Sequence, residues 1–539
     1  MKQSIFILFL ILLLAASSRA EIEQSLQLFL NNPTDVRLAE HQIKSGTRYV
    51  LLVYQNWAQL NFKEQQTYLS RAQEPPLRQR TILSPSGRFT LHWDESGLHA
   101  VPPEDISSNG IPDYIDSAAV IFDRVWQMEI DSLGFQAPPG DDGNPVERYP
   151  IYFSEMPYYG LTWYSGVDIP SLPGENYTSY MEVENDFTGF PSDSLDGLKV
   201  TAAHEFNHAI QFGYNVRVED FFFYEMTSTW MEDVVYPEIN DYYQYLDSFF
   251  GSVSNTRFNY YNAFTLYPYG NCLYLKMLAL QFNPFIVTEI WDRIKTESSI
   301  QALTHILSSP TYNTSWVLSL NQYALWLYFS GSRAIPGNYF REGVDFPEVS
   351  IKSSDKFFFD LDFNRSFSLS DFANRYILFS GLNNQSVTFN VGVPGAPQAG
   401  FLAIRDQQNS DFIPVNSIYT SEADVADTLI LILTNAEEMD TVFSVLASTE
   451  SFDQIVYGPN PVNLAEGQHW IEFRNLPTQS ELLIFTVAGK RVIQLENENR
   501  ANLQWNLKNE KGESIAAGIY LFMLRGNHLL RTGKIAVIR

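Results

Sequence analysis

Two histidines lie four residues apart in the stretch AAHEFNHAIQFGY (202–214), and a glutamate follows the first of them. Residues four apart share one face of a helix, so His204 and His208 can donate two imidazole nitrogens to one metal ion. A zinc ion held there would make a bound water molecule acidic, and Glu205 could accept its proton. The spacing therefore predicts a hydrolytic zinc site with Glu205 as the general base.

A third ligand has to distinguish this site from an ordinary helix face, because the H-E-x-x-H spacing also arises by chance. A histidine six residues after His208 is excluded, since that position is Tyr214. The ligand should then be a carboxylate on a following helix. We favour Glu225, which lies closest to the motif, over the other acidic residues nearby, Glu219, Glu232 and Asp233. For Glu232 we expect a hydrogen bond to a ligand histidine, with a solvated helix face as the alternative.

The order of elements around the motif is typical of an α+β domain. Residues 179–187 alternate like a strand, 193–212 have helical spacing, and further helices continue to about residue 330. Residues 21–80 are also mostly helical, and either a prodomain or a structural segment would account for them. We expect the catalytic domain to span residues 81–345.

The motif TAAHEFNHAIQFGY, the spacing E-x-x-S-x-W-x-E-D in residues 225–233 and the later YPYG resemble a group of secreted bacterial metallopeptidases of the glutamate-zincin type. The resemblance covers residues 80–345 and implies a zincin-like domain, with a mixed sheet and active-site helices. It implies that His204, His208 and Glu225 bind Zn²⁺ and that Glu205 is the general base. The sequence departs from the thermolysin-like pattern at Thr229, where that pattern has an aspartate.

Tyr269, in the YPYG stretch, is a candidate for stabilising negative charge in the transition state. A phenol aimed at the developing oxyanion could donate a hydrogen bond to it. The chain has 30 tyrosines, so a packing role is the alternative.

A second ion site is predicted in DISSNGIPDYID (105–116), which fits the ligand spacing of an EF-hand-like calcium loop with Gly110 at the turn. The ligands would be Asp105, Ser107, Asn109, the carbonyl of Ile111, Asp113 and Asp116. An aspartate at the last position predicts weak Ca²⁺ affinity. The resembled peptidases often carry a D-x-x-x-N-G-x-P-D-x-x-D stretch here. The alternative is an Asn-Gly turn followed by an acidic helix start.

The N-terminus predicts export. Lys2, an apolar run over residues 5–16 and small residues up to Ala20 are typical of a signal peptide over residues 1–20. The run is short for a membrane anchor, which is the alternative, and no later segment predicts a transmembrane helix in the mature chain. The net charge of −27 argues against nucleic acid or an anionic membrane as partner. The single cysteine, Cys272, cannot form an internal disulfide.

The C-terminal part is rich in short strands. Residues 346–450 have the pattern of a β-sandwich domain, and residues 455–539 that of a smaller all-β domain. In the latter, G-K-R-V, G-I-Y and G-K-I-A-V-I-R resemble the C-terminal sorting domain of the Por (type IX) secretion system of Gram-negative bacteria. The resemblance implies contact with that secretion machinery and a location outside the cell or on the outer-membrane surface. An immunoglobulin-like accessory module is the alternative.

Together these features predict a secreted zinc endopeptidase that hydrolyses peptide bonds in a protein or peptide substrate. The alternative is a cell-surface binding or adhesion protein whose zincin domain is structural or inactive. The intact Glu205 argues against this alternative, because a binding module has no need of a base at that position.

Overall fold

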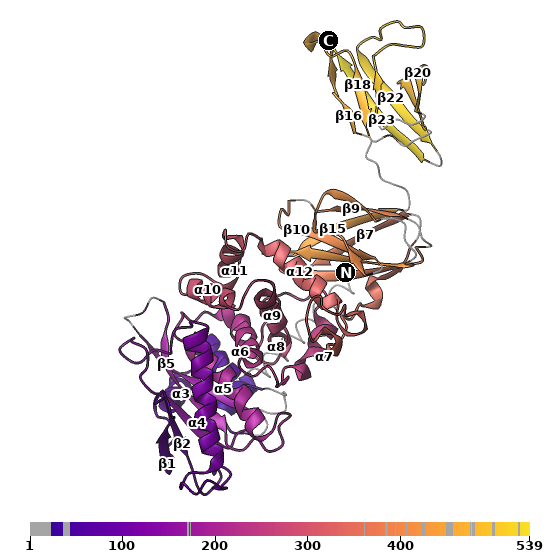
Figure 1. The fold of residues 1–539 in the computed structure, drawn as a ribbon. Helices are drawn as coiled ribbons and strands as arrows, with labels where there is room; N and C mark the ends of the chain where they lie inside the picture. Colours follow the sequence, from indigo (N-terminus) through magenta and orange to yellow (C-terminus); the bar gives the residue numbers. More distant parts are fainter. Residues whose placement is uncertain are drawn as a thin grey trace, which may run out of the picture.

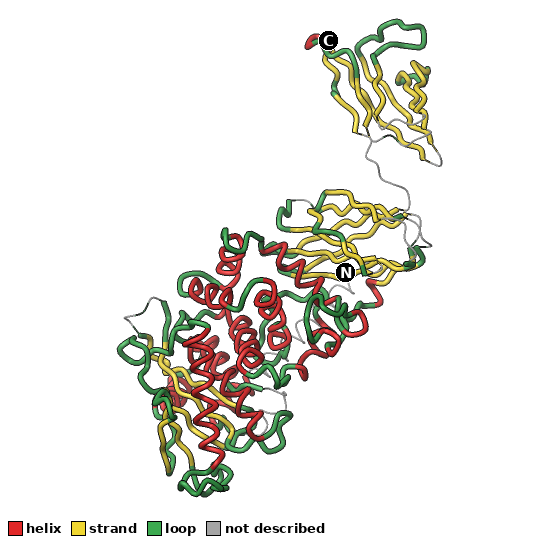
Figure 2. Tube along the Cα trace, viewed as in Figure 1, coloured by secondary structure: helices red, strands yellow, loops and turns green. Residues whose placement is uncertain are grey.

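The computed structural model describes residues 23–35, 44–169, 172, 174–359, 362–382, 386–393, 395–405, 407–421, 426–448, 456–474, 476, 480–497, 502–526 and 529–539. The predicted signal peptide, residues 1–20, lies outside them. The fold combines helices with several β-sheets, which confirms the α+β class (Figures 1 and 2). Within the described residues, no helix is both long and apolar enough to cross a bilayer.

The first sheet has the strand order β1-β2-β3-β5-β4, so that β4 is an edge strand. β2, β3 and β5 run parallel to one another, whereas β4 is antiparallel to β5. The strand expected over 179–187 is β5. The bounds are β1 Arg80–Leu83, β2 Phe89–Trp93, β3 Tyr149–Ser154, β4 Gly160–Asp168 and β5 Tyr177–Glu184.

Helices pack on this sheet. α4 (Asp113–Trp126) and α5 (Ser194–Gln211) contact its strands, and α6 (Phe221–Val235) packs against α5. α6 is buried almost all round, as its apolar sequence requires. The later helices are α7 Tyr243–Ser252, α8 Tyr267–Gly270, α9 Cys272–Gln281, α10 Phe285–Ile294, α11 Ser299–Ser308 and α12 Trp316–Tyr328.

The N-terminal helices belong to the same hydrophobic core. Residues 23–31 are helical, and α2 (Thr47–Asn56) and α3 (Phe62–Gln73) pack along the edge strand β4. The apolar residues 49–53 of α2 are buried in one cluster with residues of α5 and α6. This segment therefore shapes the region around the histidines, although it lies about 150 residues earlier in the chain.

A two-sheet sandwich follows, with the orders β11-β10-β14-β8-β6 and β13-β9-β15-β7. Its strands are β6 Lys356–Phe358, β7 Asp362–Leu369, β8 Ala373–Ser380, β9 Val387–Gly392, β10 Ala399–Arg405, β11 Gln408–Asn409, β12 Ile413–Pro414, β13 Ser417–Ser421, β14 Thr428–Asn435 and β15 Thr441–Ser448. Tyr376 and Ile432 face away from the sandwich interior and join the core of the helices. The sandwich is therefore packed directly onto the helical part.

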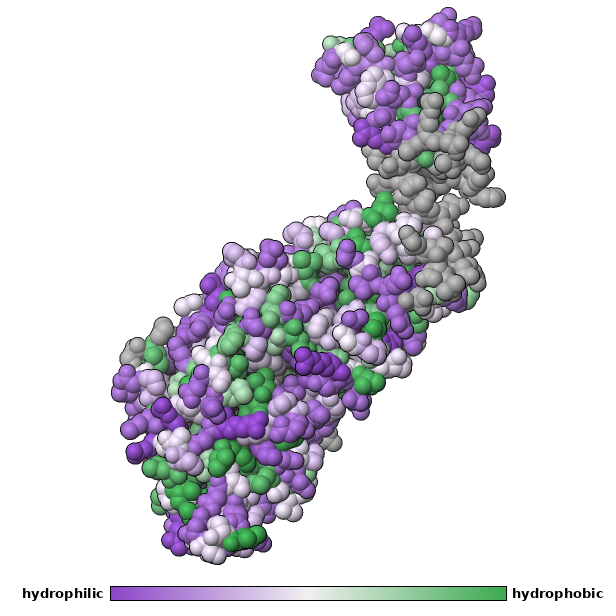
Figure 3. Space-filling view, in the orientation of Figure 1, coloured by the Kyte–Doolittle hydropathy of each residue, from purple (hydrophilic) through white to green (hydrophobic). Residues whose placement is uncertain are grey.

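The C-terminal strands form two further sheets around a core of their own, which includes Trp505 and Phe522. Their bounds are β16 Val456–Gly458, β17 Val462–Asn463, β18 Ile471–Arg474, β19 Ser480–Thr486, β20 Arg491–Asn497, β21 Asn502–Trp505, β22 Gly518–Gly526 and β23 Leu529–Ile538. The face drawn in Figure 3 is largely hydrophilic, and apolar side chains form small groups on it.

Candidate metal centre

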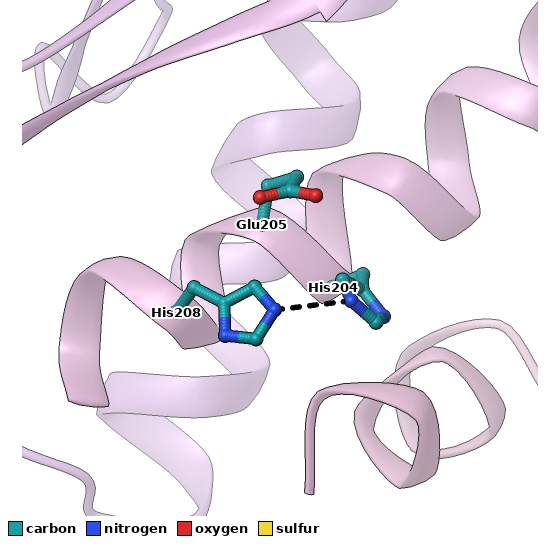
Figure 4. Close-up of side chains that lie close together, drawn as sticks. All are labelled: His204, Glu205 and His208. Atoms are coloured by element: carbon teal, nitrogen blue, oxygen red, sulfur yellow. Dashed lines mark hydrogen bonds between the residues drawn. The ribbon is translucent and has the colours of Figure 1, made fainter. Parts of the chain in front are cut away.

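The two histidines lie next to each other along α5 (Figure 4). The Nε2 atoms of His204 and His208 are 3.1 Å apart, and both side chains are buried. Three potential ligand atoms of His204, Glu205 and His208 lie within 4.8 Å of one another. The helical spacing thus produces the shared face that the sequence predicts, and this group is compatible with a metal ion.

Glu225 approaches the two histidines from α6. Its Oε2 atom lies 3.4 Å from His204 Nε2 and 3.7 Å from His208 Nε2. The close packing of α5 and α6 brings it there, and the small Ser228 on α6 contacts Gln211 on α5 through a 3.1 Å hydrogen bond. The structure therefore brings together the three residues that the sequence suggests as zinc ligands.

The other nitrogen of each imidazole already has an acceptor. His204 Nδ1 is 2.8 Å from Glu232 Oε1, and His208 Nδ1 is 2.7 Å from Gln211 Oε1. Acceptors at both Nδ1 atoms favour the tautomer with the proton on Nδ1, which leaves a lone pair on each Nε2 atom. The hydrogen bond expected for Glu232 is thus present. The sequence reasoning missed Gln211, although its place three residues after His208 on the same helix is a usable signal.

The ionisation of these groups reflects their burial and their neighbours. Burial alone would lower the pKa of His204, but Glu225 and Glu232 outweigh it and raise the pKa to about 9. Burial likewise opposes ionisation of Glu225, but the two histidines more than compensate, and its pKa falls well below the ordinary value. Glu225 is therefore a carboxylate despite its complete burial.

Several buried polar atoms at this place have no partner in hydrogen-bonding geometry among the described residues. They are both carboxylate oxygens of Glu225, Nε and Nη1 of Arg48, and the hydroxyls of Tyr261 and Tyr269. Buried polar groups are nearly always paired, and a cluster of unpaired ones points to an ion or water that would complete them. The orphaned oxygens of Glu225 fit a cation at the convergence of the Nε2 atoms.

The buried charges also fit a divalent cation. The cations of Lys44 and Arg48 are buried in this part of the protein. Four carboxylates are buried with them, those of Glu205, Glu225, Glu232 and, paired with Lys44, Asp241. Burial raises the pKa of Glu129 well above its ordinary value, so we count this residue as neutral. With both histidines deprotonated, as metal binding requires, two negative charges remain, and an uncompensated buried charge is costly. One divalent cation with both histidines neutral would balance the site.

Glu205 is held by three hydroxyl groups. Ser45 Oγ donates to Oε1 at 2.5 Å, while Thr47 Oγ1 and Thr162 Oγ1 donate to Oε2 at 2.6 and 2.8 Å. Gly160 on β4 permits this approach, because a Cβ atom there would lie 2.9 Å from Glu205 Cγ and 2.7 Å from Thr201 Cγ2. The carboxylate is thus fixed between α5 and the edge strand.

Tyr269 lies beside the histidines. The Tyr269 ring lies on α8, 5.9 Å from the His204 ring, with the Arg48 guanidinium 5.1 Å from its centroid. Its buried hydroxyl therefore borders the site, but its role as a donor stays a prediction.

In the loop 105–116, the acidic side chains bind the loop's own backbone. Asp105 accepts from the amides of Asn109 and Gly110, and Asp113 accepts from those of Ile106 and Ser107. Asn109 Nδ2 donates to Asp116, and Ile111 N donates to Asn109 Oδ1. Within the described part of the chain, the only group of three or more His, Cys, Asp or Glu side chains close enough to share an ion is the one around His204. Calcium binding by the loop stays a prediction.

Neither a protein-family model nor a curated protein sequence matches the chain. Among solved structures, PorZ, an essential surface component of the type-IX secretion system of Porphyromonas gingivalis, aligns over 18% of this chain and 14% of its own, at 20% identity and a TM-score of 0.15. Dimeric latent PorU from the same organism aligns over 35% of this chain and 19% of its own, at 14% identity and a TM-score of 0.17.

A β-glucuronidase from Ruminococcus gnavus aligns over 33% of this chain and 36% of its own, at 8% identity and a TM-score of 0.18. The chain thus spans less than a fifth of the PorZ and PorU chains, 14% and 19%. Likeness at these TM-scores establishes no shared fold, and the function has to be argued from the site itself.

Proposed function

We propose that the protein is a zinc-dependent endopeptidase with a zincin-like catalytic domain over residues 81–345. The observation that carries the proposal is the convergence of His204 Nε2, His208 Nε2 and Glu225 Oε2, with both Nδ1 atoms paired elsewhere. These three side chains would hold the ion. When bound, zinc would act as a Lewis acid that polarises the scissile carbonyl and makes water more acidic.

Glu205 would move the protons of the reaction. Its carboxylate would accept a proton from the attacking water as the new C–O bond forms, and would pass it to the leaving amine as the C–N bond breaks. Glu232 and Gln211 would keep the imidazoles oriented through the Nδ1 hydrogen bonds. Tyr269 is the candidate donor to the oxyanion.

A binding protein with an inactive site remains the second candidate, because one observation favours it. His204, Glu205, His208 and Glu225 are each at most 1% exposed, so a polypeptide cannot reach them in this conformation. An endopeptidase would need a change that opens the site.

We also propose export. The C-terminal block 455–539 would serve as the type IX sorting domain, on the strength of its sequence elements, and residues 346–450 as an accessory sandwich. The separate core of the last eight strands agrees with an independently folded unit that secretion machinery could recognise.

Glu205→Gln tests the proposed reaction. The amide is nearly isosteric and is not one of the three ligands, so the variant should retain about one zinc ion per chain. It cannot accept the proton of water, and loss of a general base costs about 10²–10⁴-fold in rate. Both proteins are assayed on a broad peptide library, before and after limited proteolysis, with metal content measured alongside. Full activity of the zinc-loaded variant would rule out this mechanism.

A further inference from the structure

Glu129 is a buried acidic residue that the proposed reaction does not use. It belongs to the π-helical turn Gln127–Ser132 after α4, where it continues the buried face of Val125 and Trp126. Among the described residues its carboxyl group has one partner, since Asn207 Nδ2 donates to Oε2 at 3.1 Å and Oε1 has none. A buried carboxyl group with a single hydrogen bond is costly. The core position would therefore favour an apolar side chain unless the group has a role.

A chain of hydrogen bonds leads from Glu129 to His208. Asn207 Nδ2 donates to Glu129, and Gln211 Nε2 donates to Asn207 Oδ1 at 2.6 Å. Gln211 Nε2 also donates to the carbonyl of Tyr224 at 3.0 Å, and Gln211 Oε1 lies 2.7 Å from His208 Nδ1. Asn207, His208 and Gln211 follow one another on α5, and all three are completely buried. The chain therefore connects Glu129 to a proposed metal ligand without contact with water.

Each side-chain amide in this chain has a donor end and an acceptor end, so its orientation determines that of the next group. An acceptor at Glu129 turns the NH₂ group of Asn207 toward it and the amide oxygen of Asn207 toward Gln211. The NH₂ group of Gln211 then faces Asn207 and the Tyr224 carbonyl, and its oxygen accepts from His208 Nδ1. The proton is thus held on Nδ1, and Nε2 keeps the lone pair that a metal ion requires.

Ser228 on α6 could favour either tautomer of His208. Its Oγ atom lies 3.3 Å from Asn207 Oδ1 and 3.3 Å from His208 Nδ1, and a hydroxyl group has one proton to donate. With the amide oxygen of Asn207 facing Ser228, the hydroxyl donates to that oxygen. With the NH₂ group of Asn207 there instead, the hydroxyl would donate to Nδ1, and the imidazole proton would have to lie on Nε2. The orientation of Asn207 therefore decides whether Nε2 is free.

We propose that Glu129 is a positioning residue that, by orienting Asn207, holds His208 in the tautomer able to bind a metal ion. The inference rests on the proposed function and concerns the same metal site. In this role Glu129 has only to accept a hydrogen bond, and it needs no charge. Burial raises the pKa of its carboxyl group well above the ordinary value, which agrees with a neutral acceptor.

The zinc affinity of the full-length chain, measured by competition with a chelator, tests this role. Glu129→Met removes the acceptor and keeps a side chain of similar length. It should weaken zinc binding about 10-fold, the lower end of the range for residues that orient a metal ligand. Glu129→Gln can still turn an oxygen toward Asn207 and should bind zinc as tightly as the wild type. A Glu129→Gln protein as weak as Glu129→Met would overturn the inference.

Val125→Ala is the control for a merely structural effect. Val125 is completely buried on the same helix face, so its truncation should lower the stability of the metal-free protein and leave the zinc affinity unchanged. Glu129→Met should change that stability less, because removal of a buried carboxyl group offsets the loss of the acceptor for Asn207. An equal loss of zinc affinity in Val125→Ala and Glu129→Met would overturn the inference.

A double-mutant cycle tests the path through Asn207. Asn207→Leu interrupts the chain of hydrogen bonds, so Glu129→Met should weaken zinc binding no further in a protein that already carries it. Additive losses would show that Glu129 acts by another route and would overturn the inference. If Glu129→Met does not fold, Glu129→Asp replaces it in each comparison, because its shorter side chain lengthens the bond to Asn207.

The outcomes separate this inference from the proposed function. Zinc bound by the wild type without cleavage of any peptide contradicts the peptidase, while weaker zinc binding in Glu129→Met than in Glu129→Gln still supports the positioning role. Peptidase activity in the wild type, together with equal zinc affinity in Glu129→Met and the wild type, overturns the positioning role and leaves the peptidase standing.

Discussion

Glu225 is a completely buried carboxylate whose two oxygens lack a hydrogen-bond donor among the described residues. Glu225→Ala should therefore weaken zinc binding strongly, since one of three ligand atoms disappears. We expect more than about a 100-fold loss of zinc affinity, beyond the effect of a residue that only orients a ligand. Competition with a metal chelator measures this loss.

Asp233→Ala is the matched control for that experiment. Asp233 lies on the same helix and was an alternative ligand in the sequence, but its carboxylate pairs with Lys276 at 2.9 Å. The variant should keep its zinc. Loss of zinc in Asp233→Ala together with full zinc in Glu225→Ala would contradict the ligand set.

The residues around the site differ in how far the sequence could reveal them. His204, Glu205 and His208 follow from helical spacing, and Glu232 from its place on the next helix. Ser45 and Thr47 could not be found this way, because they lie at the start of a helix, where small hydroxyl residues are ordinary. Their hydroxyls serve Glu205 instead, about 160 residues later. No local pattern records which distant carboxylate a buried hydroxyl meets.

Among the elements, the end of β5 carries a carboxyl group with an altered ionisation. Burial raises the pKa of Glu184 to about 7, against the opposing hydrogen bonds from the amides of Phe187 and Asp186. The folded protein then binds a proton more tightly than the unfolded chain, so stability should fall as pH rises from about 4.5 to 7. The loss should be roughly 3 kcal/mol, at 1.36 kcal/mol per pKa unit.

Chemical unfolding at pH 5 and pH 8 measures this effect. Glu184→Gln should lose less stability between the two pH values than the wild-type protein. Glu147→Gln, a change of an exposed acid whose side chain is 87% exposed, should behave as the wild type. Identical pH dependence in all three proteins would show that Glu184 is not responsible.

The loop before α4 gives a second prediction at this scale. Asp105 accepts backbone hydrogen bonds across the turn. These bonds lower its pKa below the ordinary value, and the bond from the Gly110 amide has the largest effect. If the loop also wraps calcium, the ion should raise the melting temperature of the wild type but not of Asp105→Ala. The measurement is thermal unfolding with calcium and with a chelator. Equal responses of the two proteins would leave the loop as a turn.

The helical pattern of residues 21–80 illustrates what an element's sequence leaves open. The spacing of apolar residues predicts helices with a buried face, and α2 and α3 have such faces. The spacing does not tell which part of the protein packs against the buried face of each helix. In the structure the partner is the edge strand β4, and the helices share the core of α5 and α6.

At the scale of the whole molecule, the sandwich and the helices should unfold together. Tyr376 donates to the carbonyl of Ala324 at 2.9 Å, and Asn321 donates to Thr434 Oγ1 at 2.8 Å. The last eight strands have a separate core. We expect two calorimetric transitions in the full chain, and loss of only one of them when the chain ends at Ser448. Zinc content should be unchanged by this truncation. A single transition in the full chain would contradict the division.

Lys44 has a consequence for how the protein acquires its structure. Its ammonium group forms ion pairs with Glu232 and Asp241, and both carboxylates are buried. A chain that lacked this ammonium group would have to bring several like charges together in its interior as it folds. The N-terminal segment would thus assist the folding of the rest of the chain. A chain made without this segment should therefore fail to refold after denaturation unless the segment is added back.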